Sequence, residues 1–438
     1  MTKEKYSHWT VLIVVLAAIL FSVFLLHPSW VIGSDGFGYY AYARSILFDG
    51  DLDFYNEYAF FDNLYNTKTV AGWMTPIGKT GNPFSVGPSI LWSPFILTAE
   101  TIQNTFNFYD EYVLPGYNLP FQLAIGLTTI FYTAIGLVLI FLSLNNFFKK
   151  SISWWSTILI FGISPLPYYL IYEPSMSHGL TVFSVSWLFY LSILWLKSKK
   201  NNNWLLLGIG LTSGLIFIIR WQDIIFTVIP MAIFFKKLYG SKDSPDLAKL
   251  ILKSGALISA PLLTVAATQL FAWKHLYGSF VAIPQGAAFF NLTTPHLSDF
   301  LFSGYHGMFI IHPLLLLSIV GLFLIFKRQK LLITVFLLAI MAQVYLNSGL
   351  YDWYAGGSFG ARRMISSLPI FAFGLSAFLE RTARNKIAVV LVAILFIVGT
   401  VFNGLLMISY AKNIIPLNAP TTRMEVYSAP FKILKQLD

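Results

Sequence analysis

The stretch SDGFGYYAYARSILFDGDLDFYNE, residues 34–57, follows the first long apolar run and places five carboxylates in a largely hydrophobic chain. A carboxylate at the edge of a membrane helix is costly to keep there, so it marks a functional site by default. Asp35 precedes FGYYAYARSILF, which is typical of a helix, and its side chain can cap that helix. The helix dipole favours an ionised, proton-accepting carboxylate at this end. On these residues alone, a general base and an N-cap remain equal alternatives.

The composition around this stretch is that of a membrane protein. Of 438 residues, 56% are hydrophobic and 11% are charged, with a mean hydropathy of +0.68, which excludes a soluble domain of this length. Cysteine is absent, which excludes a disulfide framework and cysteine-ligated metals. The first apolar run is long enough to span and lacks a small-residue cleavage site, so we predict a retained helix there.

Eleven apolar runs are candidate spans, and most are near the roughly 20 residues that a membrane-spanning helix needs, although 223–235 is short and 119–145 long. They are 9–31, 119–145, 152–172, 177–196, 203–219, 223–235, 254–273, 308–326, 331–349, 364–380 and 387–409. A further run, 86–103, is interrupted by Pro88 and Pro94, which favour a kink, and we predict an interfacial or re-entrant helix that does not cross. The sequence therefore predicts an all-α polytopic bundle of about eleven transmembrane helices, forming one integral membrane domain over residues 1–438.

Charge sets the orientation of this bundle. If 86–103 does not cross, one set of loops holds 18 of the 29 basic residues and 4 acidic ones, and the other side holds 11 basic and 15 acidic residues. By the positive-inside rule the first set is cytoplasmic. The first loop, 32–118, with its interfacial helices, and the tail, 410–438, are then extracytoplasmic. The net charge of +10 follows from topology and does not indicate a nucleic-acid partner.

The short outer loops carry the polar motifs. In EPSMSH (173–178), Glu173 and His178 form either a structural or a catalytic pair at the junction of two spans. In RWQD (220–223), Arg220 and Asp223 form either an ion pair within the bundle or part of a site. Lys274 and His275 end a span, where snorkelling alone accounts for the lysine.

Arg362 and Arg363 stand outside, against the positive-inside bias, after the glycine-rich GGSFG. The planar fork of arginine suits bidentate phosphate binding, and glycine N–H groups can assist it. The alternatives are a lipid-headgroup contact or a pair between an arginine and Asp352.

Asp49, Asp51 and Asp53 alternate as in a calcium loop, but Phe54 replaces the turn glycine and Phe60 the bidentate carboxylate. The EF-hand match therefore fails. A looser divalent-metal site and a solvated acidic loop stay open, and no other cofactor is expected. In the loop 274–307, His306 and its neighbours can line a cleft, but the histidines lack zinc spacing.

The order of these elements resembles the GT-C glycosyltransferases, and it is most similar to the branch that contains protein O-mannosyltransferases and lipid A aminoarabinose transferases. The resemblance in layout covers most of the chain. It is carried by SDGFGYYAYARS, EPSMSH, RWQD, YGSFVAIPQG, SGYHGMF and WYAGGSFGARR, which look like stretches of bacterial members. Asp35 matches the acidic residue that acts as general base early in the first outer loop. Many members have an Asp-Glu pair at this place, whereas in this chain Gly36 follows Asp35.

The resemblance implies a hexosyl- or pentosyltransferase that moves a sugar from a polyprenyl-phosphate donor to an acceptor hydroxyl, with inversion, at the outer face of a bacterial plasma (inner) membrane. The acceptor is a glycan, a lipid or a protein, and membrane lipids surround the bundle. Cations stabilise the departing phosphate, and the candidates are Arg362, Arg363, Arg220 and Lys274. Candidate substrate-binding residues are Tyr39, Glu173, His178, Asp223, His275 and His306. The alternative is a transporter or flippase of a lipid-linked sugar, against which stand the one-sided polar loops and the lack of an inverted repeat.

Overall fold

The computed structural model describes residues 32–33, 35–68, 74–107, 114–198, 202–240, 243 and 245–435. Within these ranges every regular element is a helix, and only two isolated β-bridges occur. The first predicted span, 9–31, lies outside the described residues. Each of the other ten predicted spans coincides with a helix or with a pair of consecutive helices, which confirms the all-α bundle.

Six of the described helices are long and apolar enough to cross a membrane. They are α6 (Leu119–Leu144), α9 (His178–Lys197), α12 (Leu247–Tyr277), α16 (Lys330–Ser348), the continuous stretch of η4 (Arg362–Ser367) and α17 (Leu368–Thr382), and α18 (Lys386–Ala411). Two shorter apolar helices, α10 (Asn203–Ile219) and α15 (Leu315–Ile325), lie among them.

Four predicted spans are broken near one end. The pairs are α7 (Lys150–Gly162) with α8 (Leu166–Ile171), η2 (Trp221–Thr227) with α11 (Val228–Gly240), α14 (Met308–Ile311) with α15, and η4 with α17. Proline explains two of the breaks, because Pro165 and Pro313 stand just before the second helix and disfavour helical backbone in the residue before them. Pro369 lies in the first turn of α17, where a proline is tolerated, and Leu368 before it is helical. Irregular backbone in a membrane protein is tolerated where it lines a cavity, and two of these breaks, at η2 and η4, line the cavity described below.

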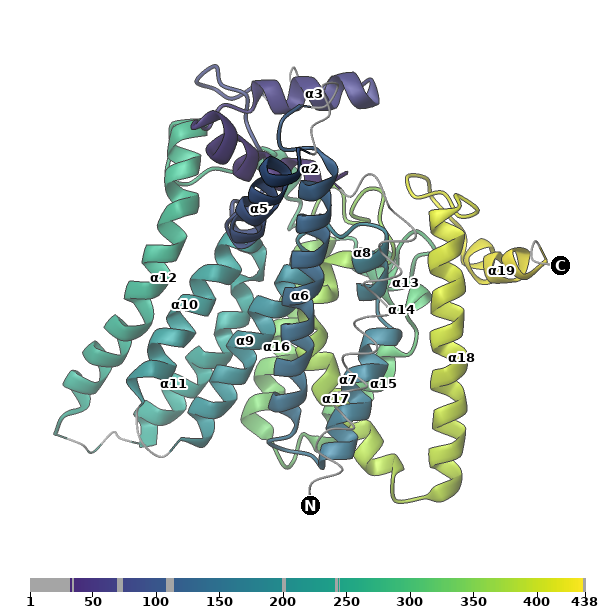
Figure 1. Ribbon diagram of the computed structural model, residues 1–438. Coiled ribbons are helices and arrows are strands. Elements are labelled where there is room, and N and C mark those ends of the chain that lie inside the picture. The colour runs from purple at the N-terminus through teal and green to yellow at the C-terminus, as the bar shows by residue number, and fades with distance from the viewer. Residues whose placement is uncertain are drawn as a thin grey trace.

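The described part of 32–118, the predicted first outer loop, forms a cap of helices at one end of the bundle. It contains α2 (Asp35–Arg44), the short π-helix η1 (Ser45–Asp49), α3 (Tyr55–Tyr65) and α5 (Gly87–Phe106). Figure 1 shows α2, α3 and α5 together at the upper end, and α5 does not extend to the lower end. The prediction that 86–103 does not cross agrees with this placement. Pro88 lies in the first turn of α5, where its missing N–H costs nothing, and Pro94 is accommodated within one continuous helix.

The basic loops lie at the opposite end. The last turn of α11, the first turn of α12 and the connection from α17 to α18 are at the bottom of Figure 1, whereas α12 ends at the top beside the cap. The two ends thus separate the loops as the charge count predicts. The remaining elements, η3 (Ala287–Phe289), α13 (Leu297–Phe302) and α19 (Arg423–Leu434), follow spans that end on the side of the cap, and α19 packs against α18.

A buried arginine holds the cap together. Arg44, at the end of α2, is 3% exposed and forms an ion pair of 2.9 Å with Glu57 of α3, which is fully buried. Arg44 also pairs with Asp49 and donates a hydrogen bond of 3.1 Å to the carbonyl of Pro115. Burial raises the pKa of Glu57 to about 7 even though the guanidinium opposes this shift. One guanidinium therefore joins three segments of the first outer loop.

We expect Arg44→Ala to destabilise the protein by about 3–5 kcal/mol, because it leaves a buried carboxylate without its partner. Thermal unfolding of the purified protein in detergent measures this loss. The double variant Arg44→Met, Glu57→Leu should recover much of it, since no buried charge is then left alone. An unchanged melting temperature in Arg44→Ala would show that the pair does not hold the cap.

The chain has no native cysteine, so single cysteines report the orientation of the bundle. Ser279, at the end of α12, and Asp243, before its start, are both exposed. With an impermeant maleimide on intact cells, we expect labelling of Ser279→Cys and labelling of Asp243→Cys only after permeabilisation. The reverse pattern would mean that the bundle is inverted.

Candidate functional site

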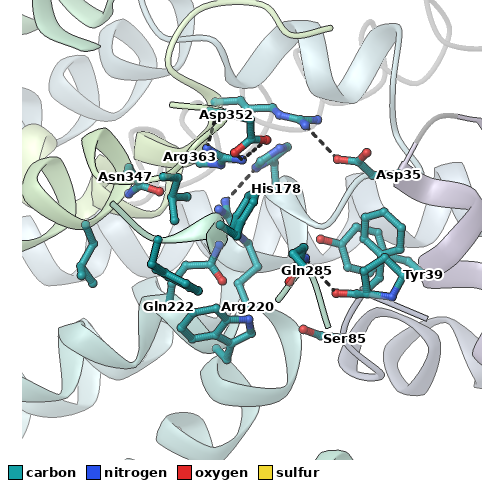
Figure 2. A pocket seen from close by; sticks show the side chains of 18 residues that line it. Asp35, Tyr39, Ser85, His178, Arg220, Gln222, Gln285, Asn347, Asp352 and Arg363 are labelled. Carbon is teal, nitrogen blue, oxygen red and sulfur yellow. Dashed lines mark hydrogen bonds and ion pairs between the residues drawn. The ribbon is translucent and has the colours of Figure 1, made fainter. Parts of the chain in front are cut away.

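A cavity of about 310 Å³ opens beneath the cap. Its wall comes from the start of α2, the segment before α5, the start of α9, the break between α10 and α11, the loop after α12, the end of α16 with the loop that follows it, and the start of η4. The lining residues are Asp35, Tyr39, Pro83, Phe84, Ser85, His178, Arg220, Trp221, Gln222, Gln285, Phe289, Phe290, Leu346, Asn347, Leu350, Asp352, Arg362 and Arg363. Figure 2 shows Asp35 and Tyr39 on one side, with Asn347 and Gln222 on the other.

Asp35 and Arg362 meet at this wall. Asp35 is the first residue of α2, and its Oδ2 lies 2.8 Å from Nη2 of Arg362, the first residue of η4. The Asp35 side chain is 34% exposed and the Arg362 side chain 9%. Within the described residues, no hydrogen bond ties the Asp35 carboxylate to the N–H groups of its own helix. The carboxylate faces the cavity, which favours the site interpretation over a simple N-cap.

The close contact between α2 and the EPSMSH loop explains why residue 36 is a glycine. A Cβ on Gly36 would collide with the side chain of Ser175, whose hydroxyl also donates to the carbonyl of Gly33 at 3.5 Å. The chain thus has no room for a second carboxylate beside Asp35. Close packing at this point fixes where Asp35 projects.

Arg362 retains capacity for another anion. Besides its ion pair with Asp35, the guanidinium makes one hydrogen bond among the described residues, from Nη1 to the sulfur of Met176 at 3.6 Å. A thioether is a weak acceptor, so the guanidinium edge at Nη1 is not satisfied by a strong one.

Arg363 is held differently from its neighbour. Its Nη2 donates to both carboxylate oxygens of Asp352, at 2.8 and 2.7 Å, and its Nη1 to the Asp352 carbonyl at 2.8 Å. The structure therefore shows the Arg–Asp352 pair that the sequence left as an alternative, and Arg363 lines the cavity with most of its donors in use. Of the two arginines, Arg362 is the better candidate for a phosphate.

Arg220 forms a second buried group with His178 and Asp223. Its Nη1 lies 3.2 Å from Nδ1 of His178, and its Nε lies 3.8 Å from Oδ2 of Asp223. Gln343 donates to the other oxygen of Asp223 at 2.8 Å. Arg220 and His178 line the cavity, but Asp223 lies behind them and does not. Asp223 thus supports Arg220 rather than reaching a substrate.

Glu173 lies close to the Asp35–Arg362 pair without lining the cavity. Burial raises the pKa of Glu173 to about 7, Arg362 opposes that shift, and Asp35 adds to it. Its Oε2 is buried without a hydrogen-bond partner. Tyr39 does line the cavity, and its hydroxyl accepts a hydrogen bond of 3.0 Å from Ser177.

Three predicted site residues lie away from the cavity. The amine of Lys274 donates to the carbonyl of Gly278 at 2.7 Å, closing the end of α12, and lies over the ring of Phe280. His275 is exposed, with its Nε2 2.8 Å from Nζ of Lys79. His306 is buried with its Nε2 donating to the carbonyl of Leu417 at 3.0 Å, and burial lowers its pKa to about 4. Their positions give no support to a role in binding donor or substrate.

The cavity also contains residues that the sequence did not single out. They are uncharged: Pro83, Phe84, Ser85, Trp221, Gln222, Gln285, Phe289, Phe290, Leu346, Asn347 and Leu350. Three of them stand inside motifs already noted, Trp221 and Gln222 in RWQD and Gln285 in YGSFVAIPQG. The sequence-based prediction selected the charged residues in and beside these motifs. These uncharged lining residues could have been found only by treating each whole motif as part of the site.

The aspartates of the first loop are engaged locally. Asp49 accepts from Asn56 at 2.7 Å besides pairing with Arg44, Asp51 accepts from Ser45 at 2.7 Å, and Asp53 accepts from the N–H of Tyr55 at 3.1 Å. Within the described residues, no three histidine, aspartate or glutamate side chains converge as metal ligands do. A divalent cation at Asp49, Asp51 and Asp53 stays a prediction, and nothing below depends on it.

The apolar helices and the capped polar cavity define a polytopic integral membrane protein with one site at the end of its bundle. Comparison by structure gives matches over nearly the whole chain. ArnT from Cupriavidus metallidurans bound to undecaprenyl phosphate matches with a TM-score of 0.53 and 10% identity, covering 97% of this chain and 74% of ArnT. The apo state of ArnT gives 0.55 and 10% identity, with 98% and 76% covered.

Archaeal oligosaccharyltransferase AglB from Archaeoglobus fulgidus, in complex with an inhibitory peptide and a dolichol-phosphate, matches with a TM-score of 0.50 and 13% identity. That match covers 99% of this chain and 55% of AglB. Comparison by sequence gave no match to a family model or to a curated protein. The chain shares its fold with ArnT and AglB, which agrees with the resemblance to the GT-C glycosyltransferases.

Proposed function

We propose that this protein transfers a sugar from a polyprenyl-phosphate donor to an acceptor hydroxyl, with inversion at the anomeric carbon. The observation that carries the proposal is the Asp35–Arg362 pair, which presents a carboxylate and a cation side by side in the cavity of a GT-C fold. We place the cavity on the extracytoplasmic side of a bacterial plasma membrane, since the basic loops lie at the other end of the bundle.

Asp35 is the general base in this mechanism. A carboxylate oxygen accepts the proton of the acceptor hydroxyl while the hydroxyl oxygen attacks the anomeric carbon. The bond between that carbon and the phosphate oxygen breaks on the opposite side, which inverts the configuration. The polyprenyl phosphate leaves with the bonding electron pair, and the proton passes from Asp35 to solvent after the product departs.

Arg362 and Arg220 stabilise the departing phosphate. Both line the cavity, and fixed cations directed at developing negative charge contribute most where water is excluded. Arg362 has the most donor capacity to spare for a phosphate oxygen, because its guanidinium bonds only Asp35 and the weakly accepting sulfur of Met176 among the described residues. The two neighbouring proteins support a lipid phosphate as donor, because ArnT was solved with undecaprenyl phosphate and AglB with a dolichol-phosphate.

The experiment that tests this proposal uses purified protein in liposomes with a polyprenyl-phosphate sugar and a mixture of glycan, lipid and peptide acceptors. Release of free polyprenyl phosphate with a glycosylated product supports the transferase. Passage of the intact sugar lipid across the bilayer without any release would instead show a transporter or flippase.

A further inference from the structure

One wall of the cavity is aromatic and uncharged. Trp221 and Phe290 lie with ring centroids 5.9 Å apart, and Phe289 packs edge-on against Phe290 at 5.8 Å. Three carboxamides, those of Gln222, Gln285 and Asn347, line the same cavity. In Figure 2, Gln222 and Asn347 lie on the side away from Asp35. Flat apolar rings with a few polar groups between them form a surface on which a small ligand is oriented.

The backbone holds this wall in place. Phe290 and Leu350 form an isolated antiparallel bridge, and the N–H of Tyr351 donates to the carbonyl of Phe289 at 2.8 Å. The N–H of Asn291 donates to the carbonyl of Gly349 at 2.6 Å. The loop after α12 is thus fixed to the end of α16. A wall fixed before binding loses little conformational entropy when it receives a ligand.

The carboxamides have hydrogen-bonding capacity to spare. Asn347 uses its N–H₂ on the carbonyl and the side-chain oxygen of Gln343, which leaves its own Oδ1 as an acceptor. Gln285 makes only a long bond of 3.4 Å, to the carbonyl of Pro83. Within the described residues, the Gln222 carboxamide bonds no other group. Amides of this kind both donate to and accept from hydroxyl groups.

The charges of the cavity are already matched with one another. Asp35 pairs with Arg362, Asp352 with Arg363, and Arg220 with Asp223 behind the wall. Each carboxylate among the described lining residues already pairs with an arginine, so an ammonium group of a ligand would have to compete with a guanidinium for it. Burying an uncompensated charge against the aromatic wall would be costly.

From this wall we infer, building on the proposed function, that the donor sugar is an uncharged polyhydroxylated ring. Its phosphate lies at Arg362, its C–H face stacks on Trp221 and Phe290, and its hydroxyls bond Gln222, Gln285 and Asn347. The same side chains select against an amino sugar, whose ammonium would face rings and amides instead of a free carboxylate.

Binding to the purified protein in nanodiscs tests the inference, with undecaprenyl phosphate alone, with its glucose ester and with its glucosamine ester. The measurement is made at about pH 6, where a sugar amine is protonated. We expect the wild type to bind the glucose ester roughly tenfold more tightly than either other lipid. Trp221→Ala and Gln222→Ala should remove that advantage and leave binding of undecaprenyl phosphate unchanged, while Trp221→Phe should keep most of it.

Trp204→Ala is the matched control, because Trp204 is 80% exposed in the first turn of α10, whereas the cavity lies beyond the last turn of that helix, and this variant should change nothing. Equal or tighter binding of the glucosamine ester by the wild type would overturn the inference. An equal loss of affinity for all three lipids in Trp221→Ala would also overturn the inference, because it would indicate a structural role for Trp221. A wild type that binds glucose and glucosamine esters alike, yet still binds undecaprenyl phosphate, leaves the proposed function standing. Failure to bind undecaprenyl phosphate at all would overturn both.

Discussion

Asp35→Asn is expected to lower the rate of sugar transfer by about 10²-fold or more, while the donor still binds. Asparagine keeps the size of the side chain and its place at the start of α2, but it cannot take a proton from the acceptor. It also releases Arg362 from its ion pair, so affinity for an anionic donor should hold or rise. Single-turnover transfer in liposomes measures the rate, and binding in nanodiscs measures the affinity.

Asp51→Asn is the matched control for this prediction. Asp51 belongs to the same outer loop, yet its carboxylate accepts from Ser45 and does not line the cavity. Turnover in this variant should stay near that of the wild type. A wild-type rate in Asp35→Asn would exclude the carboxylate as the base. A joint loss of rate and donor binding would assign Asp35 a positioning role.

Most of the fold could be predicted from hydrophobic length and loop charge. Apolar runs of membrane-spanning length predicted the helices, because backbone groups in lipid must bond within their own segment. Charge separated the loops into two groups, and the structure places those groups at opposite ends. The breaks were harder to see, since a span divided at Pro165 or Pro313 keeps the hydropathy of an unbroken one.

The site could be predicted only in part, for geometric reasons. Arg362 and Arg363 are neighbours in sequence, but they lie in a 3₁₀-helix with about three residues per turn, so their side chains diverge by roughly a third of a turn. One therefore reaches Asp35 and the other Asp352. Two adjacent arginines suggested one phosphate clamp, and spacing along the chain could not separate their partners.

Lys274 was predicted as a phosphate-binding residue because of its charge, but it does not line the cavity. It stands three residues before the end of α12, near the loop that does reach the cavity. Gly278, with a positive φ of 77°, ends the helix and offers its carbonyl to the lysine. A basic residue in the last turn of a helix is satisfied locally, so charge alone overstated its role. The uncharged wall was missed for the related reason that Gln222 and Phe290 carry no charge.

Arg362→Ala is expected to weaken binding of a polyprenyl-phosphate sugar by about 1.5–3 kcal/mol, which is roughly 10- to 150-fold. The guanidinium lines the cavity and bonds only Asp35 and a thioether among the described residues, so it retains donors for a charge-assisted hydrogen bond to a phosphate oxygen. Arg362→Lys should rescue the affinity only partly, because lysine keeps the charge without the planar fork.

Arg363→Ala and Lys274→Ala complete this comparison of cations. Arg363 is occupied by Asp352, and Lys274 closes α12 outside the cavity, so each should retain much more affinity for the donor than Arg362→Ala. The melting temperature of each variant separates a binding defect from an unfolded protein. If Arg362→Ala binds the donor as the wild type does while Arg220→Ala does not, the phosphate site belongs to the Arg220–His178 group. Asp35 would then be paired with a purely structural arginine.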